Sequence, residues 1–332
     1  MPNKEDLLVV ENLTMEFQGA KRFLEKKKPN VRAVNNVSFS VKEGETFGLV
    51  GESGCGKTTL GKCIVRLLKP TEGKLLYNDE GEWKDLLSLK KKESFELRKK
   101  LQIVFQDPYS SLNPQHTILE AFDEPMRVHG VGGKDKEARK KLIAEALERV
   151  NLQPDYMYRY PHEFSGGQRQ RLCVAKALVL QPKVIICDEP VSALDVSVQA
   201  QLLNLMRKLQ RELGVTYIFI AHDLSVVQYI SDRIGVMYLG NMVELADADE
   251  LYSNPMHPYT EALLSAVPVP IVNAKKDRII LEGDVPSPMK PPTGCPFNPR
   301  CSKCMEICKQ VKPQLEEKAD GHFVACHLYD DK

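Results

Sequence analysis

Apolar and polar positions alternate along this chain in blocks that are typical of strands and helices in turn. Short β-branched and aromatic runs predict strands at residues 7–17, 37–41, 47–50, 101–105, 184–187 and 215–220, a strand pair within 73–89 and a small strand at 278–281. Apolar residues at helical spacing predict helices at residues 60–68, 117–128, 137–150, 165–180 and 196–213. Buried strands that alternate with helices predict an α/β fold with a parallel sheet, in which ligands bind at the carboxyl ends of the strands.

The most informative stretch follows the predicted strand at 47–50 and precedes a helix. It has the pattern G-x-x-x-x-G-K-[ST], formed by Gly51, Glu52, Ser53, Gly54, Cys55, Gly56, Lys57 and Thr58. In such a loop the backbone N–H groups surround phosphate oxygens, the lysine reaches the outer phosphates and the threonine hydroxyl can ligate Mg²⁺. The alternative is a glycine-rich turn that carries a surface lysine. The flanking strand and helix favour a phosphate-binding loop that ends in a helix N-terminus.

Polar residues follow three further predicted strands. Gln106 lies just beyond 101–105, the pair Asp188 and Glu189 ends 184–187, and His222 follows 215–220. Adjacent carboxylates at the end of a buried strand are unfavourable unless they bind a metal or take part in catalysis. For Gln106 the alternative is a loop cap, and for His222 it is a hydrogen-bonded core histidine.

A second candidate anion site opens the helix predicted after residue 164. Ser165 can cap this helix, and the glycines that follow leave its N-terminus accessible to an anion. The four residues are Ser165, Gly166, Gly167 and Gln168. Two candidate anion sites in one chain are unusual.

Composition narrows the class of protein. The 332 residues are 42% hydrophobic, and 46 Lys and Arg against 45 Asp and Glu give a net charge of +1. Such a balance provides no overall field toward nucleic acid or anionic lipid. We find no run of eighteen apolar residues and no charged-then-apolar leader, so we expect a cytosolic protein without a membrane span or secretory signal.

In order and spacing, these motifs resemble the ATP-binding subunits of ABC transporters. The resemblance covers roughly residues 7–268 and includes the phosphate loop, Gln106, the signature at 165–168, the carboxylates 188–189, the segment 192–195 and His222. The signature begins with Phe164 where many relatives have leucine, and we expect that side chain to pack behind the loop. The fold implied is a P-loop NTPase cassette over residues 1–256, with a helical subdomain at about 107–180 and a Cys-rich extension at 257–332.

The resemblance implies an ATPase that works as a head-to-tail pair with a second ABC ATPase subunit. Lys57, Thr58 and Thr59 would hold ATP, and residues 165–168 of the second subunit would complete the site. The implied Mg²⁺ ligands are Thr58, Gln106 and Asp188, with Glu189 as the base that activates water and His222 at the γ-phosphate. Phe17 is the aromatic expected to stack on adenine, with Phe23 or a purely structural role for Phe17 as alternatives.

Segments at 109–114, 160–163, 190–201 and 257–259 resemble the oligopeptide and dipeptide permease branch, in particular its second, F-type ATPase subunit. The implied partners are two transmembrane permease subunits and, indirectly, an extracytoplasmic solute-binding protein. The implied location is the cytoplasmic face of the cell membrane, as a peripheral subunit. Relatives of this branch also serve nickel and oligosaccharides, so these cargoes remain alternatives to peptides.

Five cysteines crowd into 32 residues near the end of the chain, at positions 295, 301, 304, 308 and 326. A proline-rich segment with little core and so many thiols predicts a bound metal, either structural Zn²⁺ or an iron–sulfur cluster. The permease branch carries a similar extension that resembles a 4Fe-4S site, and the residues that match its pattern are Cys295, Cys301, Cys308 and Cys326. Cysteines packed as small hydrophobic residues without metal are the alternative. Because the phosphate loop, Glu189 and the signature lie outside this segment, we expect ATP binding to survive the loss of the metal.

Other ABC-type ATPases are less compatible with the pattern. A DNA-clamping ATPase inserts a long coiled coil between phosphate loop and signature, whereas here 107 residues without sustained heptads separate Lys57 from Ser165. Basic stripes interleaved with aromatic residues, which would bind nucleic acid, are absent from the sequence. A translation-factor protein would hold two cassettes in one chain, and a degenerate cassette would lack the catalytic residues found here.

Overall fold

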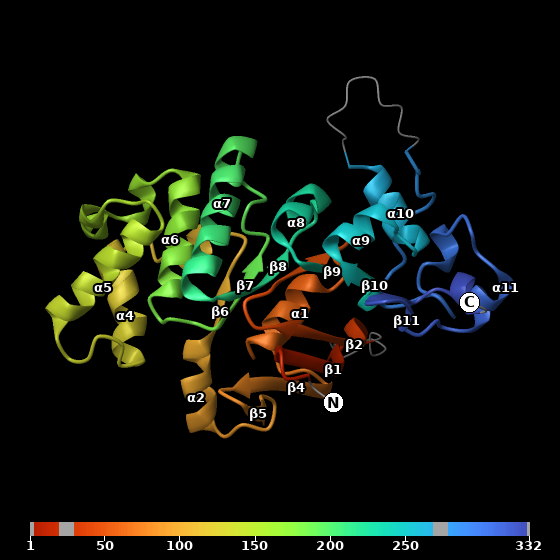
Figure 1. Cartoon of the computed structure of the whole chain (residues 1–332), viewed down its shortest axis with the longest axis horizontal. Coiled ribbons are helices and arrows are strands. Elements are labelled where there is room, and N and C mark those ends of the chain that lie inside the picture. The colour runs from red at the N-terminus through yellow and green to blue at the C-terminus, as the bar shows by residue number, and fades with distance from the viewer. Residues whose placement is uncertain (1–2, 20–29, 268–277, 331–332) are drawn as a thin grey trace, which may run out of the picture. The chain divides into compact units, whose positions relative to one another are not determined.

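The computed structural model describes residues 3–19, 30–267 and 278–330, which form two compact units (Figure 1). The first unit comprises Met1–Lys42, Thr46–Leu87 and Ala221–Lys332, and the second comprises Glu43–Glu45 and Ser88–Ile220. Each unit is built from strands that bury apolar side chains against helices.

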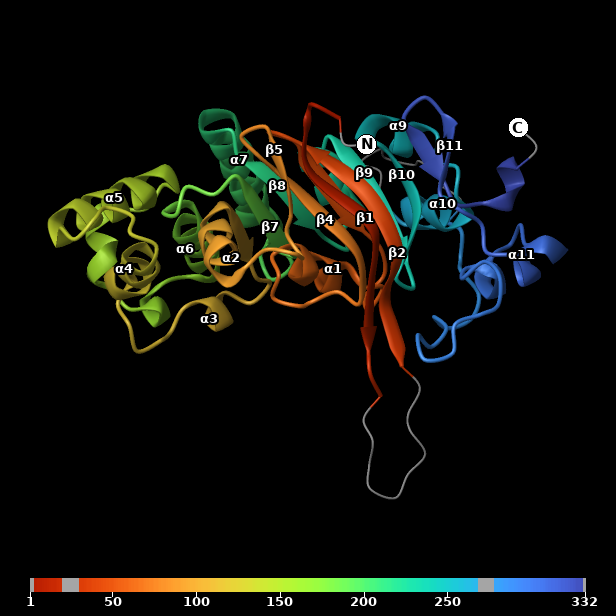
Figure 2. The same ribbon diagram turned by 90° about the horizontal axis from the view of Figure 1, so that it is seen from below.

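The first unit contains two sheets. The N-terminal sheet is antiparallel, in the order β2-β1-β4-β5, and its β1 and β2 form the long pair seen in Figure 2. The other strands of this unit follow the order β11-β12-β10-β9-β3, with β3 and β9 parallel. The strands are β1 (Asp6–Phe17), β2 (Val31–Lys42), β3 (Thr46–Val50), β4 (Glu72–Asp79), β5 (Glu82–Asp85), β9 (Arg233–Tyr238), β10 (Asn241–Asp247), β11 (Glu316–Ala319) and β12 (His322–Val324).

Helices of the first unit pack on these strands. Helix α1 contacts β1 and β2, α8 contacts β3, and α9 contacts β9 and β10. The helices are α1 (Lys57–Ile64), α8 (Leu224–Ile230), α9 (Ala248–Ser253), α10 (Pro258–Ser265) and α11 (Glu306–Gln310), with 3₁₀ turns η3 (Asn298–Arg300) and η4 (His327–Tyr329).

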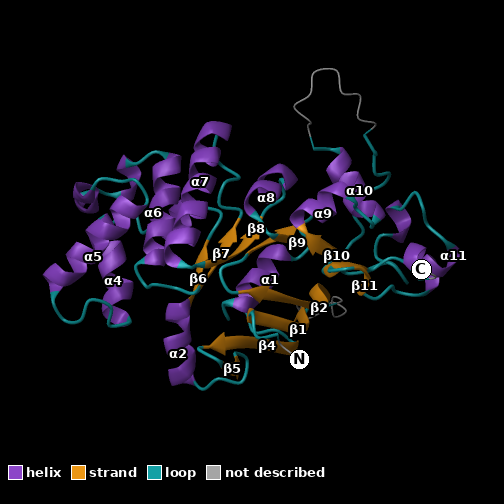
Figure 3. Cartoon of the chain, viewed as in Figure 1, coloured by secondary structure: helices purple, strands orange, loops and turns teal. Residues whose placement is uncertain are grey.

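The second unit has three parallel strands in the order β8-β7-β6 and a group of helices, purple in Figure 3. Every residue of β7 and β8 is buried, as the continuous apolar runs predicted. Helices α4, α5 and α6 contact one another in sequence, and α6 also contacts β6. The elements are α2 (Lys91–Lys100), β6 (Leu101–Val104), α3 (Pro108–Ser111), α4 (Ile118–Val128), α5 (Lys136–Arg149), η1 (Pro154–Tyr158), η2 (Pro161–Glu163), α6 (Gly166–Leu178), β7 (Val184–Asp188), α7 (Val196–Leu213) and β8 (Thr216–Ile220).

Most predicted elements are confirmed, with one early helix end. The helix expected to continue to Leu68 ends at Ile64, because Arg66 adopts a left-handed conformation (φ 59°). Helix α7 ends where predicted, at Leu213, and Gly214 caps it in the left-handed conformation that glycine accepts readily.

Candidate functional site

The phosphate loop connects β3 to α1, and two of its glycines are required by the backbone around them. Gly51 has φ 147°, and a Cβ atom placed there would lie 2.2 Å from the carbonyl oxygen of Met237. Gly56 has φ 106°, and a Cβ atom there would lie 2.0 Å from the carbonyl oxygen of Ala33. Since no other residue could occupy either position without moving a neighbouring strand, the glycines fix the path of the loop.

Lys57 is buried at the centre of this loop, with 5% of the residue exposed. Its Nζ donates hydrogen bonds to the carbonyl oxygens of Gly51 (2.6 Å) and Glu52 (3.1 Å), and lies 3.6 Å from Sγ of Cys55. Burial raises the pKa of the Cys55 thiol despite the nearby ammonium, so the thiol stays protonated. Thr58 and Thr59 occupy the first turn of α1, while Ser53 and Gly54 are exposed at the tip of the loop.

In the second unit, Asp188 ends β7 and is 4% exposed, and Glu189 follows with φ 47°. The left-handed conformation of Glu189 is uncommon outside glycine and is held by a hydrogen bond from its N–H to the carbonyl of Ile220 (2.9 Å). The side-chain amide of Gln106 donates to the Glu189 carboxylate (3.0 Å) and lies 3.4 Å from the hydroxyl of Ser192. That hydroxyl in turn donates to the Glu189 carbonyl (3.1 Å), so Gln106 and Ser192 hold Glu189 from two sides. Gln106 and Glu189 were predicted from the sequence as site residues, but the contacts of Ser192 with them were not.

The signature segment begins α6 as predicted. The Ser165 hydroxyl accepts a hydrogen bond from the Gln168 N–H (3.3 Å), and the Gln168 side chain accepts one from the Ser165 N–H (3.0 Å). A Cβ atom on Gly167 would lie 2.3 Å from the side chain of Val198, so only glycine allows α6 to approach α7 this closely. Phe164 is 3% exposed, which confirms that it packs behind the segment.

The remaining predicted residues of the nucleotide site lie in the first unit. Phe17 ends β1 with 41% of the residue exposed, so its ring is available for a ligand. Phe23 lies outside the described residues. His222 is exposed, which excludes the alternative of a core histidine.

Contacts between backbone groups hold the cysteine-rich segment together. The N–H of Cys295 donates to the carbonyl of Cys308 (2.8 Å), and a Cβ atom on Gly294 would lie 2.3 Å from that same carbonyl oxygen. None of the nine cysteines forms a disulfide bond. Burial and the neighbouring thiols raise the pKa of Cys295 to about 12 and that of Cys326 to about 11. The charges that act on Cys295 are those of Cys308, Cys326 and Cys301, and Cys304 acts in turn on Cys301, so all five thiols are electrostatically linked. Among the described residues, no three His, Cys, Asp or Glu side chains are arranged to hold a metal ion, so the expected metal is not confirmed.

A buried carboxylate joins this segment to the rest of the first unit. Glu244 on β10 is fully buried and accepts hydrogen bonds from the N–H groups of Met256 (2.6 Å) and His257 (3.0 Å) and from Nε2 of His322 (2.8 Å). The burial of His322 opposes its protonation, but the hydrogen bond and charge of Glu244 outweigh this, so its pKa is raised. The pairing of Glu244 with His322 was not predicted from the sequence, because the two residues are 78 positions apart and neither lies in a motif.

The strand expected at residues 278–281 does not form. Their backbone has no strand partner, and the N–H of Ile279 instead donates to the hydroxyl of Ser265 (3.0 Å). The proline-rich segment beyond it therefore reaches the cysteines without regular structure.

Comparison with known proteins gives whole-chain matches. A family model described as "ABC transporter" matches residues 34–192, and one described as "Oligopeptide/dipeptide transporter, C-terminal region" matches residues 243–308. The putative oligopeptide transport ATP-binding protein YkfD of Bacillus subtilis is 53% identical over 325 residues, which cover 97% of this chain and 95% of that protein. The chain belongs to the ATP-binding subunits of ABC transporters. The oligopeptide transport ATP-binding protein AppF of the same organism, 51% identical over 98% of both chains, supports the oligopeptide and dipeptide branch that the motifs resemble.

Solved structures agree with this identification. A dimeric structure of MJ0796, a bacterial ABC transporter cassette, is 30% identical with a TM-score of 0.63, and covers 73% of this chain and 99% of its own. CbiO1 from Clostridium perfringens, part of the ABC transporter complex cbiONQ, is 26% identical with the same TM-score over 76% of this chain and 92% of its own. This ABC ATPase therefore has the P-loop cassette fold that the sequence predicted.

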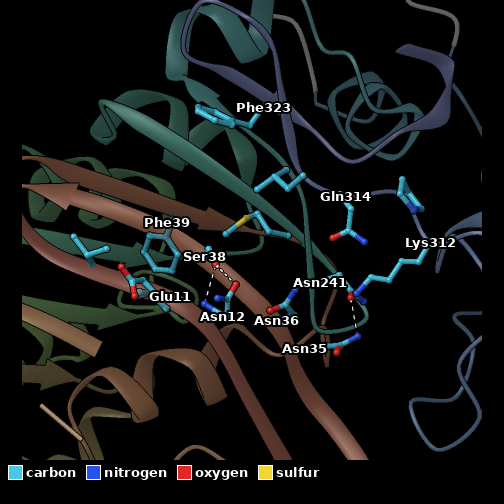
Figure 4. Close-up of a pocket in the computed structure, with 15 residues that line it drawn as sticks. Glu11, Asn12, Asn35, Asn36, Ser38, Phe39, Asn241, Lys312, Gln314 and Phe323 are labelled. Atoms are coloured by element: carbon cyan, nitrogen blue, oxygen red, sulfur yellow. Dashed lines mark hydrogen bonds between the residues drawn. The ribbon is translucent and has the colours of Figure 1, made fainter. Parts of the chain in front are cut away.

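A cavity of about 610 Å³ in the first unit of this ABC ATPase is separate from the residues predicted to bind nucleotide (Figure 4). Its walls come from β1, β2, β10 and the segment 312–315, and Asn35 donates to Asn241 across one end (3.0 Å). Figure 4 shows Lys312 and Gln314 on one side and Asn12 and Ser38 on the other.

No helix in the described part of the chain has the length and hydropathy needed to cross a membrane.

Proposed function

We propose that this ABC ATPase powers the import of oligopeptides or dipeptides through a membrane transporter. The observation that supports this most is the 53% identity over nearly the whole chain to a protein named as an oligopeptide transport subunit. The match of residues 243–308 to the oligopeptide and dipeptide C-terminal region adds to it. Import of nickel or an oligosaccharide by the same ATPase is the alternative.

In the proposed reaction, Lys57 turns from the loop carbonyls to the outer phosphates of ATP, and Thr58 and Thr59 bind from the first turn of α1. The Glu189 carboxylate, held by Gln106, takes a proton from water as the water oxygen attacks the γ-phosphorus. The bond from that phosphorus to the β–γ bridging oxygen breaks, and ADP leaves with the bridging oxygen. His222 contacts the γ-phosphate, and Phe17 stacks on adenine.

The donors assigned to Mg²⁺ are oxygen atoms of Thr58, Gln106 and Asp188, the ligand type that this ion prefers. When bound, the ion would neutralise charge on the phosphates. Asp188 suits this role because it is a carboxylate at the end of a buried strand, where a nearby cation offsets the lost hydration.

We further propose that the working form is a head-to-tail pair of ABC ATPase subunits on the cytoplasmic face of the membrane. The capped N-terminus of α6 would then face the nucleotide of the partner, and two permease subunits would couple hydrolysis to transport, with a solute-binding protein outside the cell. We also propose that the chain consists of a nucleotide-binding cassette at 1–256, with a helical subdomain at about 107–180, and an extension at 257–332.

The composition of the assembly tests this proposal. Gentle solubilisation of membranes and affinity purification of the full chain should recover two permeases and a second ATPase subunit. Recovery of nucleic-acid-binding proteins without any permease would contradict a transport role.

For the cysteines we propose a 4Fe-4S cluster held by Cys295, Cys301, Cys308 and Cys326. The clustering of these four buried or half-buried thiols supports it, because four Cys thiolates are the ligand set of a 4Fe-4S cluster. Anaerobically purified protein should contain about four irons per chain. Serine at any of the four positions should remove the iron, whereas Cys304→Ser is the matched control and should not. Zinc without iron, or no metal in protein with an ordered tail, would contradict the cluster.

A further inference from the structure

The phosphate loop is held by a residue from the cysteine-rich tail. Arg300, at the end of η3, donates from Nη1 to Oε2 of Glu52 (2.7 Å) and from Nη2 to Oε1 (3.1 Å). This is the paired geometry in which a guanidinium binds a carboxylate most strongly. The Arg300 side chain is 7% exposed and the Glu52 side chain 27%, so the ion pair is partly buried.

Aromatic residues support Arg300 and extend the contact to the loop backbone. The hydroxyl of Tyr259 accepts a hydrogen bond from the Glu52 N–H (2.8 Å), and Nη1 of Arg300 lies 3.4 Å from the hydroxyl of Tyr238. The two tyrosine rings are 4.7 Å apart, and the ring of Phe297 lies 5.2 and 5.3 Å from them. All three rings are at most 1% exposed, so they form a rigid support.

The charge of Glu52 makes this contact important for a loop that binds phosphate. A carboxylate one position after the first glycine of the loop adds negative charge beside the groups that meet ATP. Arg300 neutralises the charge of Glu52. Removal of the Arg300 side chain would leave the partly buried Glu52 carboxylate without a partner. Without Arg300, the Glu52 carboxylate could also form an ion pair with the Lys57 ammonium, which already lies in this loop.

We propose that Arg300 is a positioning residue of the nucleotide site, supplied by the tail to neutralise Glu52 and hold the phosphate loop open to ATP. The contact spans 248 positions of the chain. It therefore links the tail to the phosphate loop, although the two lie far apart in the sequence. This inference rests on the assignment of the loop to ATP, and it holds for any transported cargo.

The test is the affinity of the full chain for a non-hydrolysable ATP analogue, measured by titration. Arg300→Ala should raise Kd about tenfold or more, equal to about 1.4 kcal/mol of binding free energy. In a Glu52→Gln background, the same Arg300→Ala change should alter Kd by less than about threefold, because no carboxylate remains to be neutralised. Arg300→Lys should fall between, since it keeps the charge but loses the paired geometry.

Two further variants make the result specific. Lys303→Ala removes another ion pair of the same segment, with Glu261 at 2.7 Å, and should leave Kd unchanged. Lys57→Ala should weaken binding strongly, which confirms that the titration reports on the loop; no effect there would contradict the assignment of the loop itself. An unchanged Kd in Arg300→Ala, or equal weakening in both glutamate and glutamine backgrounds, would overturn the role of Arg300. Equal weakening by Lys303→Ala would also overturn it, because general loosening of the tail would then explain the effect.

Discussion

The side-chain amide of Gln106 and the carboxylate of Glu189 lie 3.0 Å apart and form a hydrogen bond. The bond fixes the carboxylate that we assign as the base, on a residue whose backbone is already held in an uncommon conformation. Removal of either partner should therefore affect turnover more than ATP binding.

Glu189→Gln should keep ATP binding and lower turnover at least about a hundredfold, a loss typical of a missing general base. Gln106→Ala should lower turnover by about tenfold, and the part of this loss that acts through Glu189 should disappear in the Glu189→Gln background, leaving only the part due to Gln106 as an Mg²⁺ ligand. Steady-state hydrolysis together with nucleotide titration would separate the two effects. Near-normal hydrolysis by pure Glu189→Gln protein would contradict the assignment.

The two glycines at positions 54 and 56 should respond differently to alanine. Both have positive φ, which disfavours alanine by about 1–2 kcal/mol, but position 54 has open space whereas position 56 faces the carbonyl of Ala33. Gly56→Ala should therefore lower the free energy of unfolding by about 1–3 kcal/mol more than Gly54→Ala. Denaturant unfolding of the two variants measures this difference, and equal losses would show that the loop does not depend on the close approach.

Ser165→Arg should abolish hydrolysis in the assembled transporter while the variant chain still binds ATP. The arginine removes the hydroxyl that caps α6 and places a large side chain where we expect the partner's nucleotide. Activity that stays proportional to the concentration of the isolated chain down to high dilution would contradict the paired site.

His257 should make the stability of the protein depend on pH. It is 1% exposed, and its Nδ1 accepts a hydrogen bond from the Tyr259 N–H (3.1 Å), which requires a neutral ring. Burial lowers its pKa to about 4, against the opposing charge of Glu244, whereas in the unfolded chain it is near 6.5. The unfolded state then binds more protons between these values, so stability should fall as pH drops from about 6.5 to about 4, by on the order of 3 kcal/mol.

Thermal unfolding at a series of pH values would measure this effect against His257→Asn, which keeps a cap acceptor but does not titrate. His322 acts in the opposite direction, because its raised pKa gives stability below about pH 6.5 that is lost at higher pH. The difference between the two proteins isolates His257, since His322 and Glu244 are present in both. A difference that does not change with pH would contradict a neutral buried His257.

The sequence predicted features that depend on neighbouring residues. The phosphate loop, the Ser165 cap and the end of α7 at Gly214 each follow from a few adjacent positions, because capping and tight turns are local interactions. Pairings across the chain could not be predicted in this way. Arg300 with Glu52 and His322 with Glu244 depend on how distant strands and turns come together, and neither pair lies in a recognisable spacing.

If hydrolysis at this chain drives peptide uptake, the coupling should be measurable as transport in a purified system. The complete transporter would be reconstituted in vesicles with its solute-binding protein on the outside and ATP inside, and uptake of a labelled oligopeptide measured. We predict uptake that requires ATP, is lost with Glu189→Gln in this chain, and is not inhibited by excess nickel or oligosaccharide. Uptake that continues with Glu189→Gln, or a transporter that accumulates nickel or an oligosaccharide but no peptide, would contradict ATP-driven peptide import by this chain.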